Sequence, residues 1–426
     1  MENQTEFINA RKTFRGFLWL FFTQYISLIG SQLVSFSVTW YLTKETGSSL
    51  ILSLATLSNM VPMILVSPFA GVIADRRSKN KILLIPDAIQ AIATLSLIIL
   101  FFFDVDRLWQ ILILLGIRGT CQGFQLPAAV SLNALMVPQK HIQRINALDR
   151  ILMALFSILT PILGAFILGF MTIEQIYWFD VITFIPSAIA LVLIKIPRVK
   201  TEEHKKIHFL EDFTSSLLYI KENKLISPFV LFATANFFVV PLFSLLPLLL
   251  KNYHGGSESN FGYMLASLQV GMLTGGVILM LIKKRPKMRG VVINAFINSI
   301  ILLILALIPN TVTWNFWAVY AVAFFMGLVI TLIDTQLMSI LQLSIPKEFQ
   351  GRIFSTLFTV IKSIMPLGLI LWGAIGEFTG ILFVFILTPS VSLITFIIIV
   401  LITPIFRFDS MHNSEVSSNA NKEEDS

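Results

Sequence analysis

The sequence predicts an all-α integral membrane protein with twelve transmembrane helices in two six-helix halves. The chain is 56% hydrophobic and only 13% charged, whereas a soluble domain is about 25% charged. Its mean hydropathy is +0.82. Its cations gather in every second loop between apolar runs, and a short motif recurs in the two halves. Composition, charge placement and repetition therefore indicate the same fold class.

Twelve apolar runs are long enough to cross a bilayer as helices, which takes about 20 residues each. Only α-helices and closed barrels satisfy every backbone polar group inside lipid. Because these runs are continuously apolar rather than alternating, they indicate helices. We expect the spans at residues 16–42, 49–74, 80–103, 107–137, 141–170, 174–195, 225–250, 259–282, 289–309, 313–343, 353–376 and 380–405.

The loops on the two sides of these spans differ strongly in charge. One set of loops carries basic clusters throughout, including the run at residues 76–81. The opposite set holds only three cations, Lys44, Arg107 and Lys251. By the positive-inside rule, this asymmetry predicts a multi-pass protein with both termini in the cytoplasm. The same rule explains the net charge of +7, so we expect no nucleic-acid partner.

A long polar loop after the sixth span divides the chain. Within it, Phe209, Phe213, Leu217 and Ile220 recur at helical spacing, which predicts a short amphipathic helix on the cytoplasmic membrane face. The Ser-, Asn- and Glu-rich end of the chain is typical of disorder. We expect a first half at 1–195, a linker at 196–224, a second half at 225–406 and a disordered cytoplasmic tail at 407–426.

The two halves share a motif that connects corresponding spans. Pro138 opens PQKHIQR and is followed after Arg144 by Ile145, while Pro346 opens PKEFQGR, 208 residues later, and is followed by Ile353. Two similar six-span halves related by an axis along the membrane normal describe the major facilitator fold. The alternative is that any two cytoplasmic loops look basic.

The loop GVIADRRSKNK, between the second and third spans, is the first candidate for a functional role. Gly71 permits close helix packing, Asp75 ends the second span, and Arg76 and Lys79 can exchange partners as the halves rock. We interpret this loop as a gating latch for one access state. The alternative is a plain basic loop that only sets topology.

Charges inside spans are costly and are therefore candidates for function. Arg118 lies in the middle of the fourth span, and Asp87 lies near the cytoplasmic end of the third. Asp180 lies in the sixth span and Asp334, the stronger candidate, in the tenth. Burial favours the neutral form of a carboxyl, so these acids are candidates for proton coupling or substrate contact. The alternative for Arg118 is a purely structural ion pair, and for Asp180 and Asp334 it is a structural acid held by hydrogen bonds. The alternative for Asp87 is a place at the membrane interface.

The fifth span contains Pro161 and Gly164 within TPILGAFILG, and the eleventh contains the similar MPLGLILWGAIG. Proline with nearby glycines kinks a helix, so we interpret both segments as bending elements for alternating access. The alternative is that glycine and proline are simply common in membrane helices.

Several functional classes lack their motifs. There is no GxxxxGK[ST] phosphate-binding loop, and all five histidines lie in predicted loops or tails or, for His141, at the very edge of a span. The single cysteine, Cys121, excludes an intrachain disulfide. We therefore expect neither an enzyme nor a cofactor or metal site, and any active transport must draw on an ion gradient.

Three segments carry a family resemblance that extends over about residues 16–405. QYISLIGSQLVSFSVTWYLTKETGS, GVIADRRSKNK and GRIFSTLFTVIKSIMPLGLILWG resemble the major facilitator branch of drug:proton antiporters that contains the bacterial macrolide efflux proteins. The chain departs from the family pattern at Ser78, Asn80 and Thr160. The resemblance implies gating by the loop that contains Asp75, and matches Arg118 to a fourth-span arginine linked to proton transfer.

The expected function follows from this resemblance and from the sparse membrane acids. We expect a monomeric secondary exporter of small amphiphilic drugs, macrolides first, that exchanges them for protons across the bacterial plasma membrane. Two alternatives stay open at this point. One is export of an endogenous siderophore or peptide, and the other is a membrane sensor of the same fold that does not transport.

Overall fold

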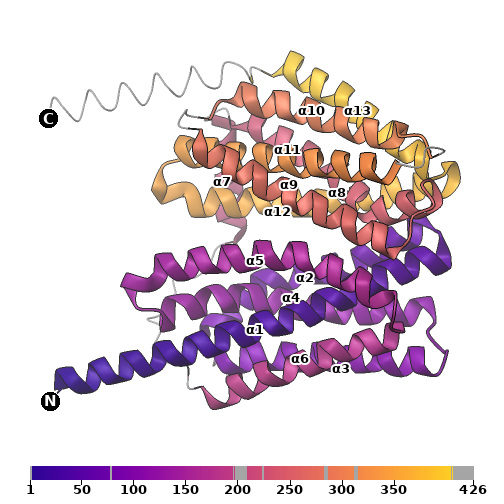
Figure 1. The fold of residues 1–426 in the computed structure, drawn as a ribbon. Coiled ribbons are helices and arrows are strands. Elements are labelled where there is room, and N and C mark those ends of the chain that lie inside the picture. Colours follow the sequence, from indigo (N-terminus) through magenta and orange to yellow (C-terminus); the bar gives the residue numbers. More distant parts are fainter. Residues whose placement is uncertain are drawn as a thin grey trace, which may run out of the picture. The chain divides into compact units, whose positions relative to one another are not determined.

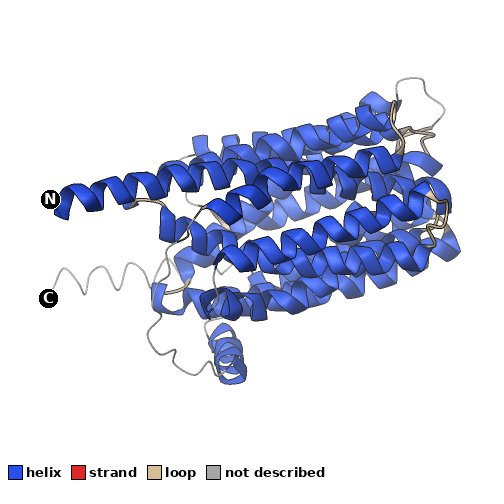
Figure 2. Cartoon of the chain, turned by 90° about the horizontal axis from the view of Figure 1, so that it is seen from below, coloured by secondary structure: helices blue, strands red, loops and turns tan. Residues whose placement is uncertain are grey.

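A computed structural model describes residues 2–76, 79–194, 196, 209–222, 225–282, 286–310, 315–403 and 405. Within these residues the chain forms thirteen helices and no strand (Figure 2). The described residues cluster into two compact units, one at 1–205 with 256–266 and the other at 206–255 with 267–426 (Figure 1). The first turns of α9 thus belong to the first unit. The domain limits expected from the sequence stay a prediction.

The helices of the first half follow the predicted spans closely. The main difference is the first helix, which begins at Glu2 rather than near residue 16. The six helices are α1 (Glu2–Thr46), α2 (Ser49–Arg76), α3 (Lys79–Phe102), α4 (Leu108–Met136), α5 (Gln139–Leu168) and α6 (Ile173–Leu193).

The second half adds a short helix from the linker, followed by six long ones. They are α7 (Phe209–Glu222), α8 (Ile226–Asn252), α9 (Glu258–Leu281), α10 (Met288–Leu307), α11 (Asn315–Ser344), α12 (Lys347–Thr379) and α13 (Ile381–Ile402). By length and composition, eleven of the described helices can cross a membrane. With α4, which is 29 residues long, they match the twelve predicted spans, so the predicted fold class is confirmed.

The short helix α7 lies where the linker was expected to form an amphipathic helix, and one of its faces contacts the rest of the second unit. Tyr219 stacks on Phe349 of α12, and Ile220 is buried in the core of the second unit. This face of α7 therefore packs on protein, because α12 offers it an aromatic partner. The remaining linker residues at 197–208 and 223–224, and the tail at 407–426, lie outside the described residues.

The repeated Pro-x5-Arg-Ile motif starts a helix in each half, whereas the sequence suggested a connecting loop. Pro138 precedes α5 with φ −58° and ψ 140°, and Pro346 precedes α12 with φ −54° and ψ 144°. The isoleucine that follows each arginine is buried, at 5% exposure for Ile145 and 1% for Ile353. The same offset of 208 residues relates the starts of α5 and α12, and of α6 and α13. The two halves are thus repeats at the level of individual helix starts.

Glycines permit close contact between α2 and α4, and again between α9 and α11. A Cβ atom added to Gly119 would collide with the backbone of Asn59, and one added to Gly327 would collide with the backbone of Leu268. These two glycines are also 208 residues apart. Membrane helices rely on such small residues, because lipid leaves no hydrophobic force to hold helices together.

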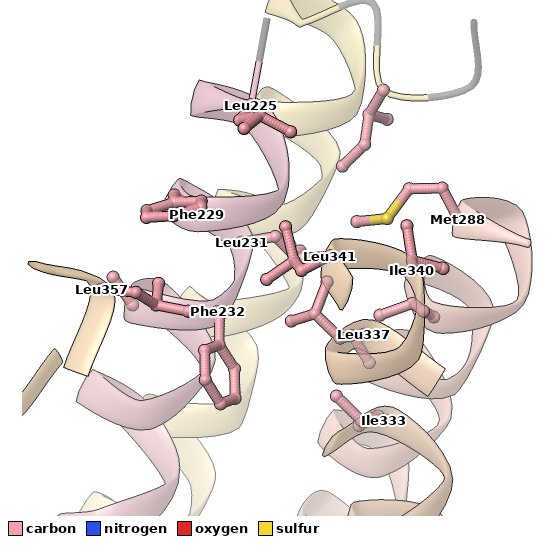
Figure 3. Packing of buried hydrophobic residues seen from close by; sticks show 14 of the residues in the cluster. Leu225, Phe229, Leu231, Phe232, Met288, Ile333, Leu337, Ile340, Leu341 and Leu357 are labelled. Atoms are coloured by element: carbon pink, nitrogen blue, oxygen red, sulfur yellow. The ribbon is translucent and has the colours of Figure 1, made fainter. Parts of the chain in front are cut away.

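Each unit has its own apolar core. In the first unit the core contains Phe17, Leu20 and Leu191. In the second, Leu225, which directly precedes α8, and Phe232 of α8 meet Met288 of α10 and Leu337 of α11 (Figure 3). These cores fix the rotation of the helices and therefore decide which polar side chains face one another.

Substituting a glycine that packs against another helix should lower stability far more than substituting a glycine with no neighbour near an added Cβ atom. We expect Gly119→Ala to lower stability by about 1–3 kcal/mol, the usual cost of overpacking. Gly276→Ala is the matched control, because nothing lies within 4 Å of a Cβ there. Thermal unfolding in detergent measures both, and equal melting temperatures for the two variants would contradict the packing described for α2 and α4.

His254, in the loop between α8 and α9, should make the fold sensitive to acid. Its side chain is 6% exposed and neither ring nitrogen has a hydrogen-bond partner among the described residues. Burial lowers the pKa of His254 below its usual value. Below about pH 6.5, His254 therefore binds a proton more readily in the unfolded chain than in the folded chain, so acid favours unfolding.

We expect His254→Phe, which keeps a ring beside Tyr253, to flatten the acid side of the stability profile. The difference is at most about 1.4 kcal/mol for each pH unit below 6.5. Melting temperatures of the two proteins between pH 5 and pH 8 measure it. The same slope in both would show that His254 takes up its proton freely in the folded state.

Candidate functional site

A polar network lies inside the first unit, between α1, α3, α4 and α6. It contains three of the four charged residues that the sequence analysis names as candidates for coupling or substrate contact, namely Asp87, Arg118 and Asp180. Each helix contributes two polar residues that are seven positions apart, and therefore on the same face about 10 Å apart. The pairs are Gln24 and Ser31, Asp87 and Thr94, Arg118 and Gln125, and Asp180 and Ser187. The network thus has two layers.

The first layer is built around a buried ion pair. Arg118 Nη1 lies 2.8 Å from Asp180 Oδ2, and the two side chains are 1% and 4% exposed. Thr94 Oγ1 accepts a hydrogen bond from Arg118 and donates one of 2.5 Å to Asp180 Oδ2. Ser31 Oγ donates to Asp180 Oδ1 at 2.7 Å. Both carboxylate oxygens are therefore satisfied, which removes much of the cost of burying the pair.

A glycine brings the first layer together. A Cβ atom at Gly30 of α1 would lie 2.6 Å from the Cα atom of Asp180. The backbones of α1 and α6 can approach only because Gly30 has no side chain. This approach places Ser31, the next residue, within hydrogen-bonding distance of Asp180.

The second layer holds a carboxylate with neutral partners. Gln24 Nε2 donates to Asp87 Oδ2 at 3.1 Å, and Gln125 Nε2 donates to Asp87 Oδ1 at 2.6 Å. Gln24 also donates to Ser187 Oγ at 2.7 Å. Asp87 is 5% exposed and has no cationic partner among the described residues. It therefore lies in the interior of the unit rather than at the interface that the sequence allowed.

Gln90 connects the two layers. Its Nε2 atom donates to Ser31 Oγ at 2.6 Å, and its Oε1 atom lies 3.5 Å from Gln125 Nε2. A change in the charge of Asp87 can reach the Arg118–Asp180 pair through these hydrogen bonds. Chemically, the network can bind and release a proton at one carboxylate while the other stays paired.

The other predicted site residues lie elsewhere. Asp334 is in the second unit, on α11. Pro161 lies within the continuous helix α5, and the Cα atom of Gly164 faces the ring of Phe36 on α1. The side chains of the gating candidates Gly71, Asp75, Arg76 and Lys79 lie outside the described part of the chain.

Sequence reasoning missed most of the neutral members of the network. Gln24, Ser31, Gln90, Thr94, Gln125 and Ser187 are not among the candidates that the sequence analysis names. The signal that identifies all of them except Gln90 is the spacing of seven between polar residues within four largely apolar spans. This spacing repeats a helix face after two turns.

Comparison with known proteins agrees with the fold. The chain matches the family of transmembrane secretion effectors over residues 9–425. It is 27% identical over 390 residues to macrolide efflux protein A of Streptococcus pyogenes, covering 91% of this chain and 95% of that one. A protein of the same name from Enterococcus faecalis is 27% identical over 327 residues, which is 76% of this chain and 100% of that one.

Solved structures share the fold at low sequence identity. A bacterial homologue of the iron transporter ferroportin in an inward-facing state has a TM-score of 0.70 and 15% identity, and covers 90% of this chain and 98% of that one. The nucleoside transporter NupG has a TM-score of 0.69 and 13% identity over the same shares of the two chains. At these identities the likeness establishes the fold alone.

Two repeated halves of six long apolar helices define a multi-pass membrane transporter and not an enzyme. The chain belongs to the transmembrane secretion effector family of the major facilitator superfamily. The predicted likeness to macrolide efflux proteins is confirmed.

Breaking the buried ion pair from one side should cost more than removing both charges. We expect Arg118→Gln to lower stability by about 3–5 kcal/mol, because it leaves Asp180 buried without its cation. The double variant Arg118→Gln with Asp180→Asn should recover most of that loss. Thermal unfolding of the single and double variants measures the coupling, and a double variant no more stable than Arg118→Gln would contradict it.

Proposed function

We propose that this transporter exports small amphiphilic drugs, macrolides first, and exchanges them for protons by alternating access. The observation that carries the proposal is the two-layer network, in which Asp180 is paired with Arg118 while Asp87 has neutral partners, chiefly the amides of Gln24 and Gln125. A charged pair inside a membrane protein is expensive and marks a functional pathway more often than a structural tie.

Asp87 is suited to exchange a proton because its partners tolerate both of its states. A glutamine amide donates to a carboxylate through nitrogen and accepts from a protonated acid through oxygen. Gln24 and Gln125 can therefore hold Asp87 with or without its proton. Asp180 is bonded to Arg118, Thr94 and Ser31, so it is better suited to hold the four helices together.

Gln24, Asp87 and Gln125 come from three different helices, and this provides a route from proton binding to movement. Protonation of Asp87 removes the charge that the two amides solvate and changes the hydrogen bonds between α1, α3 and α4. The loop with Asp75 and Arg76 is the proposed latch, and Pro161 and Gly164 are the proposed bending points. Asp334 is a further candidate for ion coupling.

The relatives support the proposed substrate and the proposed membrane. Two of them are named macrolide efflux proteins, and both of these come from bacteria. The basic loops between spans support a plasma-membrane protein with both termini in the cytoplasm. The repeat of two halves within one chain makes a monomer sufficient for alternating access.

The experiment uses inside-out membrane vesicles that hold a pH gradient. Adding erythromycin should collapse the gradient in vesicles that contain the protein, and not in vesicles without it. In Asp87→Asn vesicles we expect at least a tenfold smaller drug-induced signal, because the amide takes up no proton. Asp180→Asn should lose transport together with stability.

Asp104→Asn is the matched control for the loss of a carboxyl group. Asp104 is exposed in the loop after α3 and has a φ of 53°, a conformation that asparagine also adopts. It should keep the wild-type response. Drug-induced gradient collapse of equal size in Asp87→Asn would contradict the assignment of Asp87, and no response to any amphiphile in the wild type would contradict drug–proton exchange itself.

A further inference from the structure

The second unit contains a small polar cavity built from the helices that correspond to those of the network. It lies between α8, α10, α11 and α13, the first, third, fourth and sixth long helices of that half. Its volume is about 60 Å³, which is room for a small ion with a few water molecules. Its polar lining consists of Asn236, Asn298, Ser299, Asp334, Thr388 and Ser392.

The repeat of 208 residues shows what has changed between the halves. The position of Arg118 is taken by Met326, and the position of Asp180 by Thr388. Gln90, which connects the two layers in the first unit, corresponds to Asn298. The second half therefore lacks the internal cation and its carboxylate, and a cavity occupies that place.

The cavity contains two buried oxygen atoms that no described group satisfies. Asn298 is 3% exposed and Thr388 is 0% exposed. Asn298 Oδ1 and Thr388 Oγ1 have no hydrogen-bond partner among the described residues. An unsatisfied buried polar atom costs about 1–3 kcal/mol, so two such atoms facing one cavity point to a ligand that fills it.

Charge determines the kind of ligand. Asp334 lines the cavity and is exposed, so an ion can reach its carboxylate. No hydrogen bond or ion pair satisfies Asp334 among the described residues, in contrast to Asp180, which has Arg118. Ser299 and Ser392 add two hydroxyl groups, which bond to each other at 2.6 Å and keep lone pairs free. The lining thus offers one negative charge and several neutral oxygen atoms.

We propose that this cavity binds a monovalent cation, Na⁺, between Asp334, Asn298 and Thr388. Hard cations take oxygen ligands of this kind. A single carboxylate balances one positive charge, and no cluster of three or more histidine, cysteine or acidic side chains exists among the described residues to hold a divalent metal. The bound ion supplies from solution the positive charge that Arg118 supplies in the first unit.

The test measures binding of radioactive ²²Na⁺ to the purified full-length protein in lipid nanodiscs, with choline replacing Na⁺ at constant ionic strength. We expect saturable binding that excess unlabelled Na⁺ displaces and that excess K⁺ displaces at least tenfold less well. Asp334→Asn should abolish it. Thr388→Val should weaken it about tenfold or more while keeping shape and fold.

Thr395→Val is the matched control on α13. Thr395 has the same side chain as Thr388, bonds to the backbone oxygen of Val391, and does not line the cavity. It should bind ²²Na⁺ like the wild type. If Asp334→Asn does not fold, the comparison of Thr388→Val with Thr395→Val shows whether Na⁺ binds in the cavity.

Two results would overturn the proposal. One is an absence of saturable ²²Na⁺ binding to folded wild-type protein, which would leave the cavity to water. The other is equal binding by Thr388→Val and Thr395→Val. The assay contains neither drug nor a proton gradient, so its outcome is independent of whether the transporter exchanges drugs for protons.

Discussion

The buried ion pair between Arg118 and Asp180 is the interaction on which the first half of the molecule depends. An arginine at this depth is tolerated only with a charged partner and further hydrogen bonds, and Asp180, Thr94 and Ser31 supply them from three other helices. The pair therefore fixes the mutual rotation of α1, α3, α4 and α6. Once that rotation is fixed, Gln24, Asp87 and Gln125 meet two turns away as the second layer.

Corresponding positions in the two halves of the chain carry different side chains. At these positions the first half holds its own cation, while the second leaves a cavity with a carboxylate and unsatisfied oxygen atoms. Repeated halves of a transporter need not share chemistry to share a fold, since the fold is set by helix packing and glycine contacts such as those of Gly119 and Gly327. The proposed proton site and the proposed cation site therefore lie in different halves of the chain.

Much of the fold was predictable from the sequence, because spans in lipid need long apolar runs and cytoplasmic loops collect cations. The need of Arg118 for a partner was predictable in the same way. Its partner was not, because pairing between helices depends on their rotation, which a linear sequence does not display. The start of helices at Pro138 and Pro346 was also missed, since a polar first turn resembles a loop. The packing of α7 on α12 was not predictable either, because it depends on where Phe349 lies in space.

The central claim is that Asp87 gives up a proton when the transporter binds its substrate. The most direct measurement is proton release from purified protein in weakly buffered solution, followed with a pH indicator as erythromycin is added. The account predicts a saturable release from the wild type that is lost in Asp87→Asn and retained in Asp104→Asn. Release of the same size from Asp87→Asn, or binding of the drug without any release from the wild type, would contradict it.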